Sequence, residues 1–294
     1  MLEDLDAAAE IDKRVDQLLR EADAYGRYPT PVDDIVAAAG LVQVDDYVLS
    51  DSKIAKAPAY LRFLLRSAKQ KVQGLVDRRE RVVHISPNVE HEVKRRFVKL
   101  HETTHDILPH QQDLVYADTN ESLSLATKKL FEREANQGAA ELLFQRKRFK
   151  RDANDLEIGV AAIWLLADRY GSSFHAAFRR YAECHDAAIA AIVFDRTPVL
   201  HTPKTWKREE AMASNAWRER FGPLKWPARM DSVSHPFVAA LDFPLGVIEI
   251  EGKSGNRVTV GVEALSNSYK RFALLWIPPQ RRLLKPLKVR AIGN

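Results

Sequence analysis

The sequence, 294 residues long, predicts an α+β protein on three observations. Apolar residues recur at spacings of three and four around residue 100 and again further along, which is typical of packed helices. Short runs of alternating polarity upstream indicate a small sheet, and apolar runs with a hairpin pattern dominate the C-terminal third. The length suits one large or two modest domains. We therefore expect a core of a small sheet and a helix pair, a helical segment, and then a smaller α/β domain.

Two helices are predicted near the N-terminus. Residues 3–26 form a charged amphipathic pattern with its apolar residues on one side, and Gly26 ends it. Thr30 is a favourable N-cap for the second helix, Pro31 suits its first position, and Gly40 closes it.

Apolar runs, alternating or continuous, predict the strands. They cover residues 41–45, 82–85, 187–194, 245–251, 257–262 and 272–277. Two of these runs flank a glycine-containing turn at residues 252–256 and should form a hairpin. Residues 60–65 and 71–76 are predicted to be extended or short helical pieces. Residues 217–220 should be helical, ended by Gly222.

The strongest chemical signal is His101-Glu102-Thr-Thr-His105, the pattern H-E-x-x-H. Two histidines four residues apart lie one turn apart on one helix face, so both imidazoles reach one metal ion. Glu102 projects to the same side, where it can take a proton from metal-bound water. Pro87 and Pro109 bound a helical stripe. The stripe consists of Val93, Phe97, Leu100, Thr104, Ile107 and Leu108. A surface helix with two solvated histidines is the alternative.

A metal site needs a third protein ligand. The extension H-E-x-x-H-x-x-G-x-x-H is absent, because Leu108 and Gln111 occupy its Gly and His positions. A second helix, residues 131–144, can pack closely through its small residues and offers carboxylates instead. The candidates are Glu132, Glu134 and Glu141. In the polar linker that follows the first helix, Tyr116 or His110 could stabilise an oxyanion, or be plain surface residues.

These two helices resemble the ImmA/IrrE metallopeptidases. Arg96-Phe97 precedes the H-E-x-x-H motif, and the segments Glu132–Asn136 and Ala139–Leu143 follow the family's second-helix pattern. The resemblance covers about residues 28–185. Three departures concern packing: Thr104 replaces a glycine, Gly138 replaces an aromatic residue, and Phe144-Gln145 replaces Met-Pro.

The resemblance implies a zincin-like core and a set of residue roles. His101, His105 and Glu132 would hold Zn²⁺, and Glu102 would be the catalytic general base. A His-His-Glu donor set also accepts Mn²⁺ or Fe²⁺. The implied activity is a zinc-dependent endopeptidase that cuts a helix-turn-helix transcriptional repressor in a stress or mobile-element circuit. Alternatives are a non-catalytic DNA- or protein-binding regulator that retains the metallopeptidase fold, and a partner in a two-gene toxin–antitoxin module.

Three parts are expected along the chain. Residues 1–145 would be the metallopeptidase domain with its N-terminal helix. Residues 146–186 would be a helical segment resembling a helix-turn-helix, with helices at 156–170 and 173–184. Residues 187–294 would be an α/β domain that senses a signal or binds a partner, GAF-like by strand order alone.

Charge and cysteine content limit partners and compartment. The net charge of +5 and pI of about 9.2 permit DNA binding but are modest for a dedicated nucleic-acid binder. The basic run 145–151 could contact nucleic acid or complement the C-terminal dipole of the preceding helix. A single cysteine, Cys184, fits a reducing compartment. Without a signal peptide or an apolar run of membrane length, we expect a cytoplasmic protein with no membrane partner.

Overall fold

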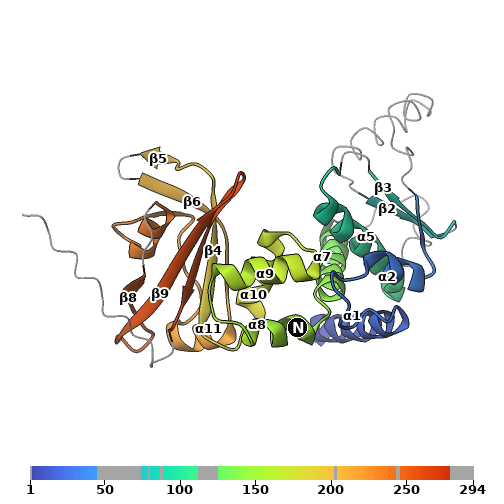
Figure 1. The fold of residues 1–294 in the computed structure, drawn as a ribbon, viewed down its shortest axis with the longest axis horizontal. Coiled ribbons are helices and arrows are strands. Elements are labelled where there is room, and N and C mark those ends of the chain that lie inside the picture. The colour runs from blue at the N-terminus through green and yellow to red at the C-terminus, as the bar shows by residue number, and fades with distance from the viewer. Residues whose placement is uncertain are drawn as a thin grey trace, which may run out of the picture. The chain divides into compact units, whose positions relative to one another are not determined.

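The computed structural model describes residues 2–44, 74–78, 80–86, 89–111, 125–201, 204–242 and 246–278. They form an α+β protein with two sheets, as predicted (Figure 1). The chain divides into two compact units. Unit 1 comprises residues 1–149 and 167–173, and unit 2 comprises residues 150–166 and 174–294. The expected boundaries at residues 145 and 186 stay predictions.

Unit 1 combines helices with a three-stranded sheet. Its helices are α1 (Leu2–Glu21), α2 (Val32–Ala38), α5 (Glu92–Ile107), α7 (Leu125–Leu143), the start of α8 (Lys147–Asn154) and the end of α9 (Val160–Tyr170). Its strands are β1 (Val42–Val44), β2 (Gly74–Asp77) and β3 (Val82–Ile85). The sheet order is β1-β3-β2, with β1 parallel and β2 antiparallel to β3. The predicted strands at 41–45 and 82–85 are therefore present within the described residues.

Small side chains bring α5 and α7 together. Ala135 and Ala139 of α7 are fully buried, as is Leu142 one turn later. Their small size lets the two helix backbones approach, so that side chains of α7 reach the face of α5 that carries the histidines. The predicted close packing of this helix pair is confirmed.

Two local predictions in unit 1 are wrong. Thr30 does not cap α2: Pro31 holds the N-cap position, and the Thr30 hydroxyl donates instead to the carbonyl of Leu143, 2.7 Å away. The first helix ends at Glu21 rather than Gly26, because the chain turns with positive φ at Asp23. In both places a tertiary contact or turn replaces the local signal.

The buried face of α5 is more polar than the apolar stripe predicted. Val93 is 38% exposed, whereas Lys99, Thr103 and Asp106 are buried. Each buried polar group has a partner, which removes most of the cost of burial. Lys99 Nζ lies 2.7 Å from Asp33 Oδ1, and Asp106 accepts from a nearby arginine at 2.8 Å. The Thr103 hydroxyl donates to the Lys99 carbonyl within the helix.

The basic run at residues 145–151 begins a helix instead of ending one. α7 stops at Leu143, a turn with positive φ at Gln145 and Arg146 follows, and α8 then starts. Lys147 and Arg148 therefore lie at the N-terminus of α8, where the dipole does not favour them, while Arg151 lies in its last turn. The interpretation as a run that stabilises the C-terminus of the preceding helix is wrong, because the last turn of α7 holds no basic residue. Arg146 pairs instead with acidic residues of α1, Asp12 at 3.0 Å and Asp16 at 3.3 Å.

Unit 2 is built on an antiparallel sheet. Its strands are β4 (Ile189–Asp195), β5 (Leu200–His201), β6 (Lys204–Ala213), β7 (Arg229–Asp231), β8 (Val247–Glu251), β9 (Arg257–Ser266) and β10 (Lys270–Trp276). Its further helices are α10 (Phe174–Cys184), α11 (Asn215–Phe221) and the 3₁₀ helix η2 (Pro236–Leu241). The strand order is β5-β6-β4-β10-β9-β8, with β7 on β6. The predicted buried strand, hairpin and last strand correspond to β4, β8–β9 and β10.

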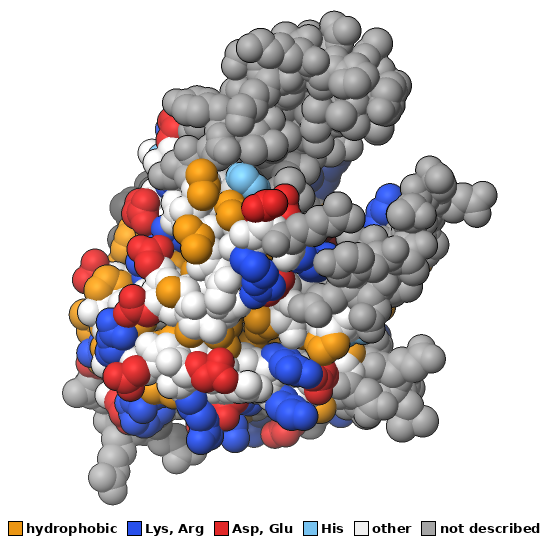
Figure 2. Space-filling model, turned by 90° about the vertical axis from the view of Figure 1, so that its right-hand side faces the viewer, with side chains coloured by type: hydrophobic (Ala, Val, Ile, Leu, Met, Phe, Trp, Pro, Cys, Tyr) orange, Lys and Arg blue, Asp and Glu red, His pale blue; other side chains and the backbone are white. Residues whose placement is uncertain are grey.

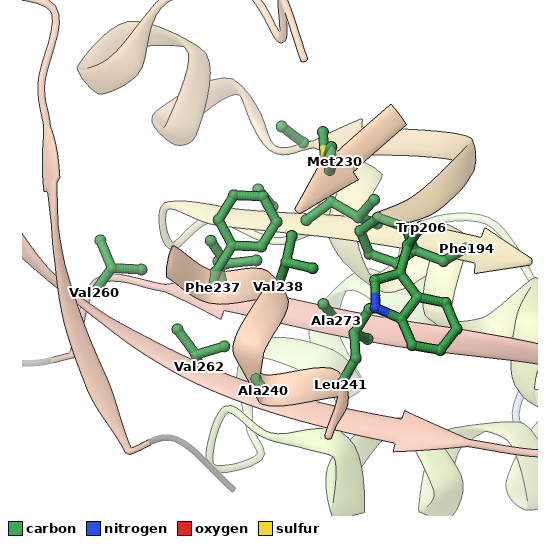
Figure 3. Packing of buried hydrophobic residues seen from close by; sticks show 14 of the residues in the cluster. Phe194, Trp206, Met230, Phe237, Val238, Ala240, Leu241, Val260, Val262 and Ala273 are labelled. Atoms are coloured by element: carbon green, nitrogen blue, oxygen red, sulfur yellow. The ribbon is translucent and has the colours of Figure 1, made fainter. Parts of the chain in front are cut away.

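The core of unit 2 contains large aromatic side chains packed between the sheet, α11 and η2. Trp206 and Trp217 are each 1% exposed, and Phe194, Phe237 and Leu241 pack in the same cluster (Figure 3). The five tryptophans of the chain all fall in unit 2. They are Trp164, Trp206, Trp217, Trp226 and Trp276. Trp206 and Trp217 are therefore core residues of unit 2.

The two helices expected to resemble a helix-turn-helix are α9 and α10, separated by Gly171 at φ +64°. α10 packs on the sheet of unit 2, where Phe174 and Phe178 contact Phe272 with ring centroids 5.0 and 5.1 Å apart. Arg179 on this helix lies 3.6 Å from Glu210 of β6 and also pairs with Glu183 on α10 itself.

No helix in the described part of the chain is long and apolar enough to cross a membrane.

Candidate metal centre

α5 places its two histidines together. His101 and His105 lie one helical turn apart on α5, and their Nε2 atoms are 3.1 Å apart. The ring centroids are 4.7 Å apart and nearly perpendicular, at 82°. The His101 side chain is 15% exposed and the His105 side chain is 16% exposed, so solvent reaches the two nitrogens only partly.

α7 adds a carboxylate to this pair. Glu132 Oε2 lies 3.4 Å from His101 Nε2, and Glu132 Oε1 lies 3.7 Å from His105 Nε2. The three residues form the group of potential metal ligands among the described residues, with ligand atoms within 4.8 Å of one another. Around a tetrahedral ion with bonds of about 2.0–2.1 Å, ligand atoms lie about 3.3–3.4 Å apart. The observed separations bracket that value, so this donor set fits a zinc ion.

The other two carboxylates considered as third ligands are not in this group. Glu134 is 5% exposed and accepts hydrogen bonds from His110 and Gln111. Glu141 lies two turns further along α7. Glu134 lies about 200° from Glu132 around the helix axis, and its carboxylate binds Gln111 and His110 instead of the two histidines. Among the three candidates, the structure brings Glu132 to the histidines.

Glu102 is buried beside β2. A Cβ added at Gly74 would lie 2.9 Å from Glu102 Oε1 and 2.6 Å from Val98 Cγ1, so only glycine fits there. Burial raises the pKa of Glu102 to about 7; the charge of His101 opposes this rise, and that of Glu132 adds to it. A carboxyl group with a pKa near neutrality is suited to take and return a proton. The sequence contained no signal for the contact with Gly74, because residues 28 apart along the chain make it.

The pKa values of the two histidines shift in opposite directions. Burial disfavours the charged form of both. For His101, the hydrogen bond with Glu132 and the charges of Glu102 and Glu132 outweigh burial, and the pKa is raised. For His105, burial and the charge of His101 lower the pKa. The hydrogen bond from His101 in turn lowers the pKa of Glu132. The lowered pKa of His105 favours the neutral form that metal binding requires, whereas the raised pKa of His101 means that metal binding there has to displace a proton.

A chain of buried hydrogen bonds lies behind His105. Its Nδ1 is 2.6 Å from Gln111 Oε1, and Gln111 Nε2 is 2.7 Å from Glu134 Oε2. His110 Nε2 reaches the same carboxylate oxygen at 2.7 Å. His110 is thus engaged with Glu134, and nothing ties it to an oxyanion role. Tyr116, the other candidate for that role, lies outside the described residues. Gln111 is a site residue that the sequence does not predict, since a single glutamine carries no pattern.

Comparison with known proteins finds a family model that matches part of the chain. Residues 61–181 match the peptidase M78 model, described as the IrrE N-terminal-like domain. The predicted resemblance to the ImmA/IrrE type is thereby confirmed over this stretch, which includes both helices of the site. No curated protein matches the chain. A solved structure titled Mycobacterium tuberculosis transcriptional regulator is similar at 16% identity and a TM-score of 0.46, covering 90% of this chain and 74% of that one.

Proposed function

We propose that this chain, with its IrrE N-terminal-like domain, is a zinc-dependent endopeptidase with a zincin-like core. One observation carries the proposal: His101 and His105 of α5 and Glu132 of α7 bring ligand atoms within 4.8 Å of one another, and Glu102 lies on the same turn of α5 as the two histidines. In known sites of this kind the fourth position is left for water or substrate. Mn²⁺ and Fe²⁺ suit the same donors, so metal content has to be measured.

In peptide hydrolysis, three residues would bind the metal ion and a fourth would transfer the proton. His101, His105 and Glu132 would hold the ion. When bound, the ion supplies Lewis acidity that lowers the pKa of water and polarises the scissile carbonyl. Glu102 would take the proton of the attacking water and later give it to the leaving amine. Its position against β2 orients the carboxylate, because the close approach of Gly74 leaves it little freedom.

The first test compares Glu102→Gln with the wild-type chain. Glutamine keeps the size of the side chain but cannot accept the proton, so we expect about one zinc per chain in both proteins and a loss of cleavage of about 10²–10⁴-fold in the variant. Zinc is measured by mass spectrometry of the dialysed protein. Cleavage is measured by labelling the new N-termini that appear in a cell lysate. Equal cleavage by the two proteins would contradict the assigned role.

His101→Ala and Glu132→Ala are the controls for the metal site. Both variants should lose zinc, whereas Glu141→Ala, on the same helix as Glu132, should keep it. Zinc retained in Glu132→Ala would assign the third ligand elsewhere.

For the substrate, we propose a helix-turn-helix repressor, with unit 2 docking that repressor or gating cleavage. The proposal comes from the family resemblance, and N-terminal labelling tests it directly. Cut sites confined to repressors of this class would support it, and cut sites spread over unrelated proteins would reject it.

The non-catalytic DNA-binding alternative has less support in the described residues. Arg146 pairs with Asp12, Lys150 with Asp186 at 2.6 Å, and a similar pair neutralises Arg179. On the face shown in Figure 2, basic and acidic side chains are interspersed among the described residues. Steeply salt-dependent binding to random DNA would favour this alternative.

A further inference from the structure

The hydrogen bonds that link His105, Gln111 and Glu134 have a defined donor and acceptor at each step. A carboxylate offers only hydrogen-bond acceptors, so Glu134 can receive but not give a proton. Its Oε2 atom lies 2.7 Å from the side-chain nitrogen of Gln111, which must therefore donate through its NH₂ group. In the flipped orientation of the amide, two oxygen atoms would face each other at the same distance. Glu134 thus determines which way the Gln111 amide points.

The orientation of Gln111 decides the tautomer of His105. With its NH₂ group toward Glu134, Gln111 presents Oε1 to His105 Nδ1 at 2.6 Å. An amide oxygen only accepts, so the proton of the neutral imidazole lies on Nδ1. The lone pair then lies on Nε2, the atom that faces His101 and Glu132. The other tautomer would place a proton between His105 and the ion.

Burial makes this directing effect strong. Gln111 is 1% exposed and Glu134 is 5% exposed, so water does not compete for their hydrogen bonds. Gln111 is held in a turn after α5, its backbone N–H bonded to the carbonyl of Leu108 at 3.1 Å, and Glu134 is anchored on α7. Glu134 lies on α7, the helix that carries Glu132, and Gln111 follows α5, the helix that carries the two histidines.

We propose that Glu134 is a positioning residue: acting through Gln111, it holds His105 as the Nδ1–H tautomer with Nε2 available to the metal. The inference rests on the proposed metal site. It assigns a role to a buried acid that is not itself a ligand. Loss of such an outer contact to a metal-bound histidine typically costs 10–100-fold in metal affinity.

The test uses single and exchanged variants of the full chain. In Glu134→Gln either orientation of Gln111 finds a partner, so zinc affinity should fall by about 10–100-fold. Glu141→Gln makes the same change on the same helix and should bind zinc like the wild type. His110→Ala removes the other donor to Glu134 without breaking the path to His105, and its affinity should change by less than about 10-fold. Affinity is measured by competition with a chelating dye.

The double exchange Gln111→Glu with Glu134→Gln is the rescue. Glu at position 111 can only accept from His105 Nδ1, and Gln at position 134 can donate to it, so the path is restored with its polarity kept. Gln111→Glu alone places two carboxylates face to face, so this single variant should bind zinc more weakly than the double variant. We expect the double variant to recover at least about 10-fold of the affinity lost in Glu134→Gln.

The tautomer itself is read in the metal-free protein by long-range ¹H–¹⁵N correlation spectra of ¹⁵N-histidine. His105 should be Nδ1–H in the wild type and in the double variant, and mixed in Glu134→Gln. Unchanged tautomer and affinity in Glu134→Gln, or no rescue in the double variant, would overturn the proposal. Tight zinc binding without any cleavage would instead reject the endopeptidase and leave this inference standing. If the wild type binds no zinc, the metal site fails, and the metal-free spectra still decide the tautomer.

Discussion

Thr104 and Gly138 are two departures from the family pattern that meet in space. A Cβ added at Gly138 would lie 2.4 Å from Thr104 Cγ2 and 3.0 Å from its hydroxyl oxygen. Thr104 is fully buried and its hydroxyl donates to the Leu100 carbonyl. The threonine on α5 thus occupies the volume that a side chain on α7 would need. The exchange of a large and a small residue across the interface keeps the two helices at packing distance.

This contact predicts a non-additive pair of substitutions. Gly138→Ala should lower the free energy of unfolding by about 1–3 kcal/mol, because the new methyl group overpacks the interface. In a Thr104→Ala background the same change should cost at least about 1 kcal/mol less, since the clashing methyl is gone. Urea unfolding of the four proteins of the cycle measures both values. Additive effects within error would show that the two residues are not coupled.

At the level of single residues, spacing predicted the ligands and missed their support. His101, Glu102 and His105 follow from one helical turn, and Glu132 from its resemblance to a family motif. The contact between Gln111 and Glu134 depends on the register between two helices, which no local pattern encodes. The same limit explains Thr30, whose hydroxyl binds the end of α7 instead of capping its own helix.

Among the secondary-structure elements, β4 and α11 are joined by one buried hydroxyl. Ser214 Oγ accepts from the backbone N–H of Trp217, 3.2 Å away, and so caps α11. The same oxygen accepts from the N–H of Ile189 and donates to the carbonyl of Ala187. A fully buried serine therefore satisfies three backbone groups, one in α11, one in β4 and one just before β4.

Removal of this hydroxyl should destabilise unit 2. Ser214→Ala loses an N-cap and leaves buried backbone groups without partners, so we expect the free energy of unfolding to fall by about 2 kcal/mol. Ser214→Thr retains the hydroxyl and should cost less. Urea unfolding followed by tryptophan fluorescence measures the difference. Zinc content should not change in either variant, because the ligands lie in unit 1; a loss of zinc would contradict this separation.

Strands were predictable where both faces are buried or where alternation is regular. β4 is a continuous apolar run, which predicts a buried strand. β6 was missed, although it is one of the longest strands. Its buried residues do not alternate, because Thr205 and Trp206 are both buried and a bulge opposite Val193–Phe194 shifts the register. Charged residues then fill the middle of the strand, which hides its period from the sequence.

At the scale of the whole chain, the metal site belongs to one unit. All three proposed ligands and Glu102 lie in unit 1, on helices α5 and α7. A ligand that binds only the folded state stabilises that state by RT ln(1 + L/Kd), where L is the free ligand concentration. Zinc should therefore stabilise the fold of unit 1 directly, beyond any effect on activity.

We expect free zinc at 100 times its dissociation constant to raise the free energy of unfolding of unit 1 by about 2.7 kcal/mol. Helical circular dichroism during urea unfolding measures this, with and without a chelator. His101→Ala should show no zinc effect. An equal zinc effect in that variant would mean that the ion binds elsewhere.

The placement of the tryptophans has an optical consequence. Because all five lie in unit 2 and the proposed ligands lie in unit 1, intrinsic emission follows the unit that does not bind the ion. A single sample, heated with and without zinc, therefore measures the cooperativity of the chain. If the emission transition moves together with the circular dichroism, the two units unfold as one thermodynamic system. If zinc leaves the midpoint of the emission transition unchanged, the two units unfold independently.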